Sequence, residues 1–159
     1  MKDRTLFDDA LPRRSILTGA AALGVLATTG FAKDAFATPK EAKKMLAELT
    51  GVKKPKKGRV TIEVPSLTDQ GALVPIRITV DSPMSADDYV KEIHVVGERN
   101  SKPEIATFRF TPLSGKAEVS TRVRMKETQI VLAAAVMNDG SVFLGKARCR
   151  VVGGAGGCG

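Results

Sequence analysis

An alternation of apolar and polar residues limits the fold of this chain more than any other feature of its sequence. Between residues 60 and 152, short stretches carry an apolar residue at every second position, and residues 74–80 are the clearest case. Successive side chains of a β-strand point to opposite faces, so this period indicates strands with one buried face. Turn residues such as Asn138-Asp139-Gly140 separate the stretches. The predicted strands cover residues 60–64, 74–80, 90–96, 105–111, 117–125, 130–137 and 142–152.

These strands number about seven, with no helical pattern between them, and they predict an all-β fold. An immunoglobulin-like antiparallel β-sandwich is the natural way to pack them. Residues 130–137 are almost continuously apolar, so we expect this strand to be covered on both faces. The chain has no tryptophan, so the cysteine–tryptophan–cysteine signature of antibody domains is missing and only the architecture is predicted.

One short helix is predicted before the strands. Thr38 suits the N-cap, Pro39 the first helical position and Glu41 the first turn. Gly51 is a typical C-terminal stop, so the helix should end by about Thr50. The apolar positions have the spacing of an amphipathic helix, and they are Ala42, Met45, Leu46 and Leu49.

The first 37 residues have the features of an export signal. Arg13-Arg14 precedes an uncharged stretch at residues 16–31, which is too short and too rich in small residues to span a membrane. Ala35-Phe36-Ala37 has the pattern of a cleavage site. Together these features predict a twin-arginine signal peptide at residues 1–37 and a periplasmic mature protein. An ordinary secretory signal and an uncleaved anchor are the alternatives.

The mature chain divides into one folded domain at residues 38–152 and a tail at residues 153–159, without an internal repeat. Residues 53–59 form a linker with five positive charges, in a chain whose net charge is +8. This cluster either attracts an acidic partner or an anionic substrate, or is simply a solvated linker. No stacking aromatic residue and no recognition module accompany it, so we expect neither nucleic acid nor a membrane as a partner.

The tail combines five glycines with a single thiol. Glycine lacks a Cβ and samples both signs of φ, so we expect a flexible arm instead of a folded element. Fully extended, the arm would reach about 20–25 Å from its anchor, and its bare backbone fits a narrow channel. A thiol on such a tether is typical of a carrier. The residues of the arm are Gly153, Gly154, Ala155, Gly156, Gly157, Cys158 and Gly159.

Cys158 has no visible means of activating itself. A thiol must ionise to act as a nucleophile, yet no His, Lys or Arg stands beside Cys158 in the sequence, and the C-terminal carboxylate disfavours the thiolate. Activation would therefore come from an enzyme pocket that the arm enters. This pattern predicts a carrier subunit without catalytic residues of its own. An intermolecular disulfide with no chemical role, and attachment of a lipid or a crosslink, are the alternatives.

The other candidate residues are assigned structural roles. Cys149 alternates with arginines in the last strand, so its side chain should point inward as a small apolar residue. A bridge from Cys149 to Cys158 is the lesser alternative. His94 is expected to be an ordinary strand residue, and Asp87-Asp88 a solvated turn. We predict no zinc site, no calcium site and no cofactor.

Six features occur in a characteristic order along the chain. The most specific is the terminal Gly156-Gly157-Cys158-Gly159. The others are the twin-arginine leader, Val74-Pro75 leading to Asp81-Ser82-Pro83-Met84, Asp88-Tyr89-Val90, Phe108-Arg109-Phe110-Thr111-Pro112 leading to Ser114-Gly115, and Thr121-Arg122-Val123-Arg124. From about Ala42 to its end, the chain resembles the SoxY family of the bacterial thiosulfate-oxidising (Sox) system.

The resemblance implies that Cys158 holds thiosulfate and later sulfur intermediates as covalent adducts. It implies a heterodimer with a second β-sandwich subunit, SoxZ. It also implies three enzymes as partners. A c-type cytochrome enzyme couples thiosulfate to the thiol, a thiol-sulfate hydrolase releases sulfate, and a sulfur dehydrogenase oxidises the remaining sulfur in relatives that have one. Relatives end in Gly-Gly-Cys-Gly-Gly, and this tail ends one glycine earlier.

We therefore predict a non-enzymatic periplasmic carrier with Cys158 as its attachment site. One rival hypothesis is an exported structural β-sandwich whose tail cysteine only forms an intermolecular disulfide. The other is a thiol enzyme, such as a sulfurtransferase, that acts alone. Met84 and the edges of the last strands are candidates for the surface that binds the partner subunit.

Overall fold

The computed structural model describes residues 37–152. The predicted leader, apart from Ala37, and the predicted arm at residues 153–159 lie outside this range. The described residues form one α-helix, nine strands and one short 3-10 helix. In chain order the elements are α1 (Pro39–Thr50), β1 (Lys56–Lys57), β2 (Val60–Glu63), β3 (Leu67–Thr68), β4 (Val74–Val80), β5 (Val90–Gly97), β6 (Glu104–Arg109), the 3-10 helix η1 (Pro112–Ser114), β7 (Glu118–Val123), β8 (Gln129–Met137) and β9 (Val142–Val151).

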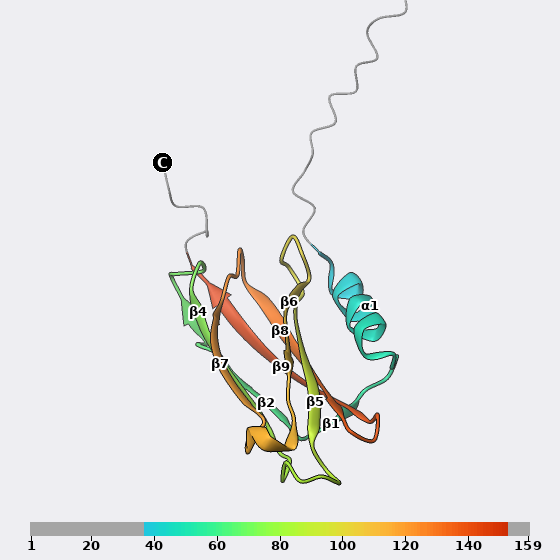
Figure 1. Ribbon diagram of the computed structural model, residues 1–159. Coiled ribbons are helices and arrows are strands. Elements are labelled where there is room, and N and C mark those ends of the chain that lie inside the picture. The colour runs from blue at the N-terminus through green and yellow to red at the C-terminus, as the bar shows by residue number, and fades with distance from the viewer. Residues whose placement is uncertain (1–36, 153–159) are drawn as a thin grey trace, which may run out of the picture. The chain divides into compact units, whose positions relative to one another are not determined.

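The strands form two sheets that pack face to face across an apolar core (Figure 1). The larger sheet has the order β1-β9-β8-β5-β6, with β3 also paired to β9, and the smaller sheet has the order β2-β4-β7. All pairs between the longer strands are antiparallel. This arrangement confirms the predicted antiparallel β-sandwich with one short N-terminal helix.

Two strands of two residues each accompany the seven that the sequence predicts. β1 pairs in parallel with the start of β9, and β3 pairs in parallel with its end. Between them the chain crosses to the smaller sheet and forms β2, so β1 lies inside the segment that was expected to be a linker. Two residues are too few to show an alternating pattern, which is why the sequence does not indicate these strands.

β4 shows how the alternating pattern builds the core. Val74, Ile76, Ile78 and Val80 are buried, and the three residues between them are exposed. Cys149 of β9 lies in the same core and is fully buried, as predicted. The inward-facing side chains of the two sheets thus meet in one continuous apolar layer.

β8 is buried on both faces, as its apolar run predicts. Val131 and Ala133 face the core between the sheets. Leu132 points the other way and joins Ala42 and Leu46 of α1 in a second apolar cluster, which we call the α1 cluster. Figure 1 shows α1 over the outer face of the larger sheet, where it packs against β5 and β8. Within residues 37–152, no helix is long and apolar enough to cross a membrane.

Both ends of α1 are capped by the residues that the sequence indicates. The Glu41 N–H donates to Thr38 Oγ1 (3.3 Å) and the Thr38 N–H donates to Glu41 Oε2 (2.7 Å), which together form a capping box. Pro39 occupies the first turn. Gly51 ends the helix with φ at 70°, a left-handed conformation that costs glycine little. The helix boundaries therefore agree with the prediction.

Gly145 allows β2 to pass close to β9. A Cβ built on Gly145 would lie 2.7 Å from Val60 Cγ1 and 2.8 Å from the backbone oxygen of Val60. A backbone oxygen cannot rotate away as a side chain can, so any larger residue at position 145 would force the two strands apart. The edge strand of the smaller sheet meets the larger sheet at this point.

Replacing Leu46 by alanine should weaken the docking of α1. Leu46 is 4% exposed, so the truncation leaves a cavity in the α1 cluster. We expect a loss of about 2–4 kcal/mol in the free energy of unfolding. Leu113 offers a matched control because it is 98% exposed on η1, and Leu113→Ala should cost less than about 0.5 kcal/mol. Urea titrations measure both variants, and equal losses would contradict the packing of α1.

Replacing Gly145 by alanine should lower stability by about 2–3 kcal/mol, because the new methyl group overlaps the backbone of β2. Thermal unfolding followed by circular dichroism would report the change. Ser120→Ala, at an exposed position of β7, is the control and should stay within about 0.5 kcal/mol of the parent protein. An unchanged melting temperature for Gly145→Ala would mean that β2 and β9 are not in close contact.

Candidate functional site

The predicted arm begins where the described residues end, directly after β9. We call Arg150, Val151 and Val152 the arm root. The Arg150 N–H donates to Ser66 O (3.0 Å) and the Val152 N–H donates to Thr68 O (2.8 Å). The Val151 N–H donates to Thr128 Oγ1 (3.0 Å). Hydrogen bonds from both sides therefore hold the backbone in place up to the residue before the arm.

Cys158, the predicted attachment site, lies outside the described residues, as do the glycines of the predicted arm. Its distance along the chain from the arm root is nevertheless known, because Cys158 lies six positions after Val152. An extended chain of this length spans at most about 20 Å. The surface within this distance of Val152 is the part of the body that the thiol can reach.

Three large apolar side chains are exposed in the arm root and in the segment that runs from β3 to β4. Leu67 of β3 is 55% exposed, Leu73 just before β4 is 61% exposed, and Val152 is 46% exposed. Leu67 and Thr68 pair with Arg150 and Val151, so β3 and the end of β9 lie side by side. The sequence does not reveal this group, because the two residues of β3 are too few to show an alternating pattern.

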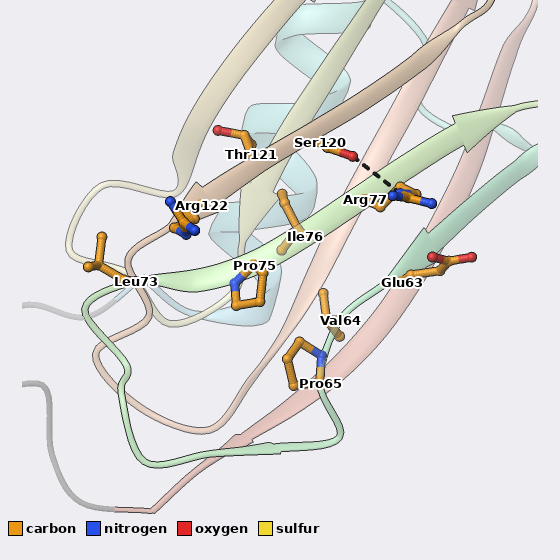
Figure 2. Close-up of a pocket in the computed structure, with 10 residues that line it drawn as sticks. All are labelled: Glu63, Val64, Pro65, Leu73, Pro75, Ile76, Arg77, Ser120, Thr121 and Arg122. Carbon is orange, nitrogen blue, oxygen red and sulfur yellow. Dashed lines mark hydrogen bonds between the residues drawn. The ribbon is translucent and has the colours of Figure 1, made fainter.

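An open groove of about 1010 Å³ runs over the outer face of the smaller sheet (Figure 2). Leu73 and Pro75 form part of its apolar lining, and Arg77 and Arg122 supply positive charge. Arg77 Nε donates to Ser120 Oγ (3.2 Å) and lies 3.5 Å from Glu118 Oε1. Besides these residues the lining holds Glu63 and the hydroxyls of Ser120 and Thr121, and it contains no thiol and no imidazole.

Cys149 is buried in the core between the sheets, as the alternation predicts. Burial raises the pKa of its thiol above the ordinary value, because the thiolate would have to lose its hydration. A thiol that is both inaccessible and hard to ionise cannot act as a nucleophile. Cys149 is therefore a structural residue.

His94 is also a residue of the sheet, in β5, as predicted. Its Nδ1 lies 2.9 Å from Thr107 Oγ1, and its Nε2 lies 3.2 Å from Glu92 Oε2 without the alignment of a hydrogen bond. The Thr107 hydroxyl donates to Glu104 Oε1 (3.2 Å) and is thus directed away from the imidazole. His94 is buried and has no serine or cysteine beside it, so it does not form a catalytic pair.

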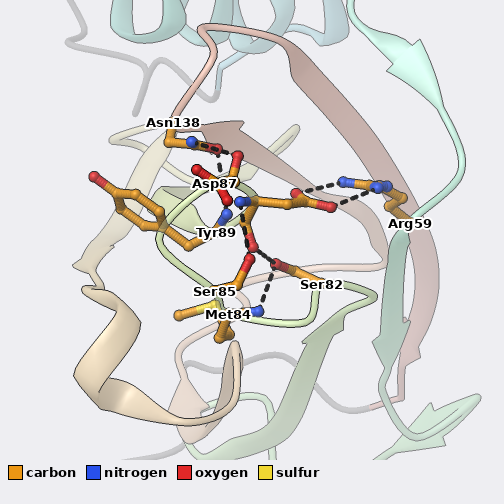
Figure 3. Close-up of polar contacts among 8 residues, drawn as sticks. Arg59, Ser82, Met84, Ser85, Asp87, Tyr89 and Asn138 are labelled. Atoms are coloured by element: carbon orange, nitrogen blue, oxygen red, sulfur yellow. Dashed lines mark hydrogen bonds and ion pairs between the residues drawn. The ribbon is translucent and has the colours of Figure 1, made fainter.

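The loop between β4 and β5, part of which Figure 3 shows, departs from expectation at Asp88. Instead of lying in a merely solvated turn, the Asp88 carboxylate accepts two hydrogen bonds of 3.0 Å each from the Arg59 guanidinium. This paired geometry raises the pKa of Arg59 and ties the basic segment to the loop. The two residues are separated by 29 positions, so no local pattern could reveal the pair.

Met84 in the same loop corrects a second expectation. It was a candidate for the surface that binds a partner subunit, but it is only 4% exposed and belongs to the core between the sheets. Its φ of 52° lies in the left-handed region, and its N–H donates to Ser82 Oγ (3.2 Å). The turn that leads into β5 thus buries the methionine side chain, which removes it from any docking surface.

The basic segment at residues 53–59 lies at the start of β9, at the opposite end of this strand from the arm root. Lys57 pairs with Leu144, near the beginning of the strand. Lys56 Nζ and Arg59 Cζ lie 5.9 Å and 5.3 Å from the centre of the Phe143 ring. Residues 37–152 hold no group of three or more His, Cys, Asp or Glu that could bind a metal ion. Because the basic segment and the arm root lie at opposite ends of β9, the basic segment is not beside the arm root.

Solved structures with a similar fold include superoxide reductases. The superoxide reductase (neelaredoxin) from Ignicoccus hospitalis aligns with a TM-score of 0.54 at 16% identity, over 73% of this chain and 94% of that one. A candidate superoxide reductase from Thermotoga maritima aligns with a TM-score of 0.51 at 18% identity, over 63% of this chain and 89% of that one. At such identities the likeness concerns the β-sandwich fold alone. A comparison with curated protein sequences gives no match.

A family comparison identifies the chain more closely. The profile of the family described as sulfur oxidation protein SoxY matches residues 46–158. The matched part is more than two thirds of the chain, and it includes the β-sandwich, the arm root and Cys158. The chain therefore belongs to the SoxY family, and its role lies in Sox sulfur oxidation.

Proposed function

We propose that this protein is a periplasmic carrier that holds thiosulfate-derived sulfur on Cys158 and presents it to the enzymes of the Sox system. The observation that carries the proposal is the extent of the family match, which runs through the tail as far as Cys158. Within residues 37–152 the one thiol is buried, and the one imidazole is buried beside Thr107, whose hydroxyl donates to Glu104. The body then serves as an anchor and a docking surface.

Attachment joins the Cys158 sulfur to the outer sulfur of thiosulfate. The thiol loses its proton, an S–S bond forms, and two electrons pass to a c-type cytochrome enzyme. The balance is R–SH plus S₂O₃²⁻ giving R–S–S–SO₃⁻, one proton and two electrons. The thiolate is the reacting form, so the enzyme pocket has to promote its ionisation.

Hydrolysis then releases sulfate from the adduct. Water attacks the sulfonate sulfur, and the bond between this sulfur and the neighbouring sulfur breaks. R–S–S–SO₃⁻ and water give R–S–S⁻, sulfate and two protons. A sulfur dehydrogenase, in a system that has one, would oxidise the sulfur that stays on Cys158. The glycines around Cys158 suit visits to several pockets, because no side chain has to match any of them.

The proposal includes a location and a second subunit. A twin-arginine leader at residues 1–37 would export the folded carrier to the periplasm. A SoxZ-type β-sandwich would form the heterodimer with residues 38–152. No cofactor is required, because the cytochrome and the hydrolase supply the redox and hydrolytic chemistry.

Cys158→Ser should abolish the covalent adduct, whereas Cys149→Ser should retain it. The purified mature protein is incubated with thiosulfate and the c-type cytochrome enzyme, and its intact mass is measured. We expect one thiosulfonate per chain, placed on the C-terminal peptide, in the parent protein and in Cys149→Ser. The second variant costs stability, since it buries a hydroxyl in the core, but leaves the acceptor atom in place.

An adduct that persists in Cys158→Ser would end the carrier proposal. A protein whose reductant-sensitive dimer disappears in Cys158→Ser, while thiosulfate oxidation continues unchanged, would be a structural module linked by a disulfide. Both outcomes can be read from the same samples by mass spectrometry and by size-exclusion chromatography with and without reductant.

Alkylation should separate the two thiols. In the native protein one equivalent of iodoacetamide should react, at Cys158, and a second only after unfolding, because burial raises the pKa of Cys149 and excludes the reagent. The rate at Cys158 should rise with pH with a midpoint near that of free cysteine, about 8.5. A midpoint below about 7 would instead favour an enzyme with its own activated thiol.

A further inference from the structure

Three cations form a row along the outer face of β9. Lys146, Arg148 and Arg150 occupy alternate positions of this strand and are exposed. Cys149 between them points into the core. None of these three cations forms an ion pair with an acidic residue in the range 37–152. We call these three residues the basic row.

The geometry of the basic row fits an extended partner better than a small anion. Side chains two positions apart on a strand are rooted about 6.6 Å from each other, so the row is about 13 Å long. Mutual repulsion keeps the charged ends apart. A single thiosulfate ion is too small to bridge such a row. A line of carboxylates on a protein surface would match its length and its charge.

The basic row ends at the arm root. Arg150 belongs to the arm root itself, and it pairs with Leu67 of β3 across the neighbouring strands. Paired residues of adjacent strands point to the same face of a sheet, so the exposed Leu67 side chain lies beside Arg150. Arginine next to an exposed apolar side chain is a combination common in protein interfaces.

An enzyme that receives the arm has to approach this surface. Cys158 can lie at most about 20 Å from Val152. If the reaction centre of the enzyme is buried, the mouth of its channel must therefore lie close to the arm root when Cys158 reaches that centre. The basic segment at residues 53–59 cannot serve the same purpose. It lies at the other end of β9, and Arg59 there is already paired with Asp88.

We propose that the basic row binds carboxylates on the rim of the channel through which the c-type cytochrome enzyme receives the arm. This inference rests on the proposed carrier function. The row orients the carrier during the encounter, and Leu67 contacts the rim once the arm is inserted. Charges at the edge of an interface act mainly on the rate of association and on its dependence on salt.

The test compares two triple variants with the same loss of charge. The first replaces Lys146, Arg148 and Arg150 by glutamine. The second replaces Lys53, Lys54 and Lys116, which are exposed and lie away from the arm root. Both are made in the Cys158→Ser protein, purified with its second subunit, so that binding to the c-type cytochrome enzyme is measured by calorimetry without any reaction.

The basic-row variant should bind the cytochrome enzyme about tenfold more weakly at low ionic strength, and the difference should shrink at about 0.5 M salt. The control variant should change its affinity by about twofold or less. Equal changes in the two variants would overturn the inference, because net charge alone would then explain them. If the basic-row variant alone no longer bound the second subunit, the inference would also be overturned, because the basic row would then belong to the interface of the heterodimer.

The same substitutions in the protein that retains Cys158 distinguish this inference from the proposed function. If the parent protein gains no adduct from thiosulfate and the enzyme, the carrier function fails, whatever the binding data show. If the parent gains the adduct and the basic-row variant gains it with the same kcat/KM as the control variant, only the inference fails. The expected result is a kcat/KM about tenfold lower for the basic-row variant, with kcat unchanged.

Discussion

The backbone pairing of β9 on both of its edges is the interaction on which the rest of the structure depends. β8 pairs with it along almost its whole length, β1 holds its start and β3 holds its end. The tail continues directly from this strand. Hydrogen bonds to Ser66, Thr68 and Thr128 fix the backbone where this tail begins, as the proposed carrier function requires.

Burial determines the chemistry of Cys149. Cys149 lies on the inward face of β9, where desolvation keeps its thiol protonated and packing keeps reagents out. The thiol nine positions later is separated from the sheet by a glycine-rich segment with no side chain larger than a methyl group. Cys149 therefore does not compete with Cys158 in the carrier role that we propose for the latter. The two groups of positively charged residues are also separated in space. The basic segment at residues 53–59 lies at one end of β9, and the basic row leads to the other end.

Local patterns in the sequence predicted most of the fold because they reflect local rules. The buried positions of β4 and the two-sided burial of β8 follow from side-chain alternation, and the ends of α1 follow from capping chemistry. What the patterns could not show depends on partners that are distant in the chain. β3 forms only because the chain returns to β9, and the Arg59–Asp88 pair joins residues 29 positions apart. Met84 was wrongly expected on a surface, because the course of its loop decides on which side it lies.

By itself, the sequence determined that the chain forms a β-sandwich with one N-terminal helix, and that Cys158 stands at the end of a glycine-rich tail without an activating neighbour. The tertiary structure alone decided where that tail is anchored and what surrounds the arm root. Leu67, Leu73 and Arg150 come from separate segments, and only the pairing of β3 with β9 and the turn before β4 bring them to one end of the sandwich. Periodicity encodes which face a side chain takes on its own strand, whereas the position of one strand beside another follows from the packing of the whole chain.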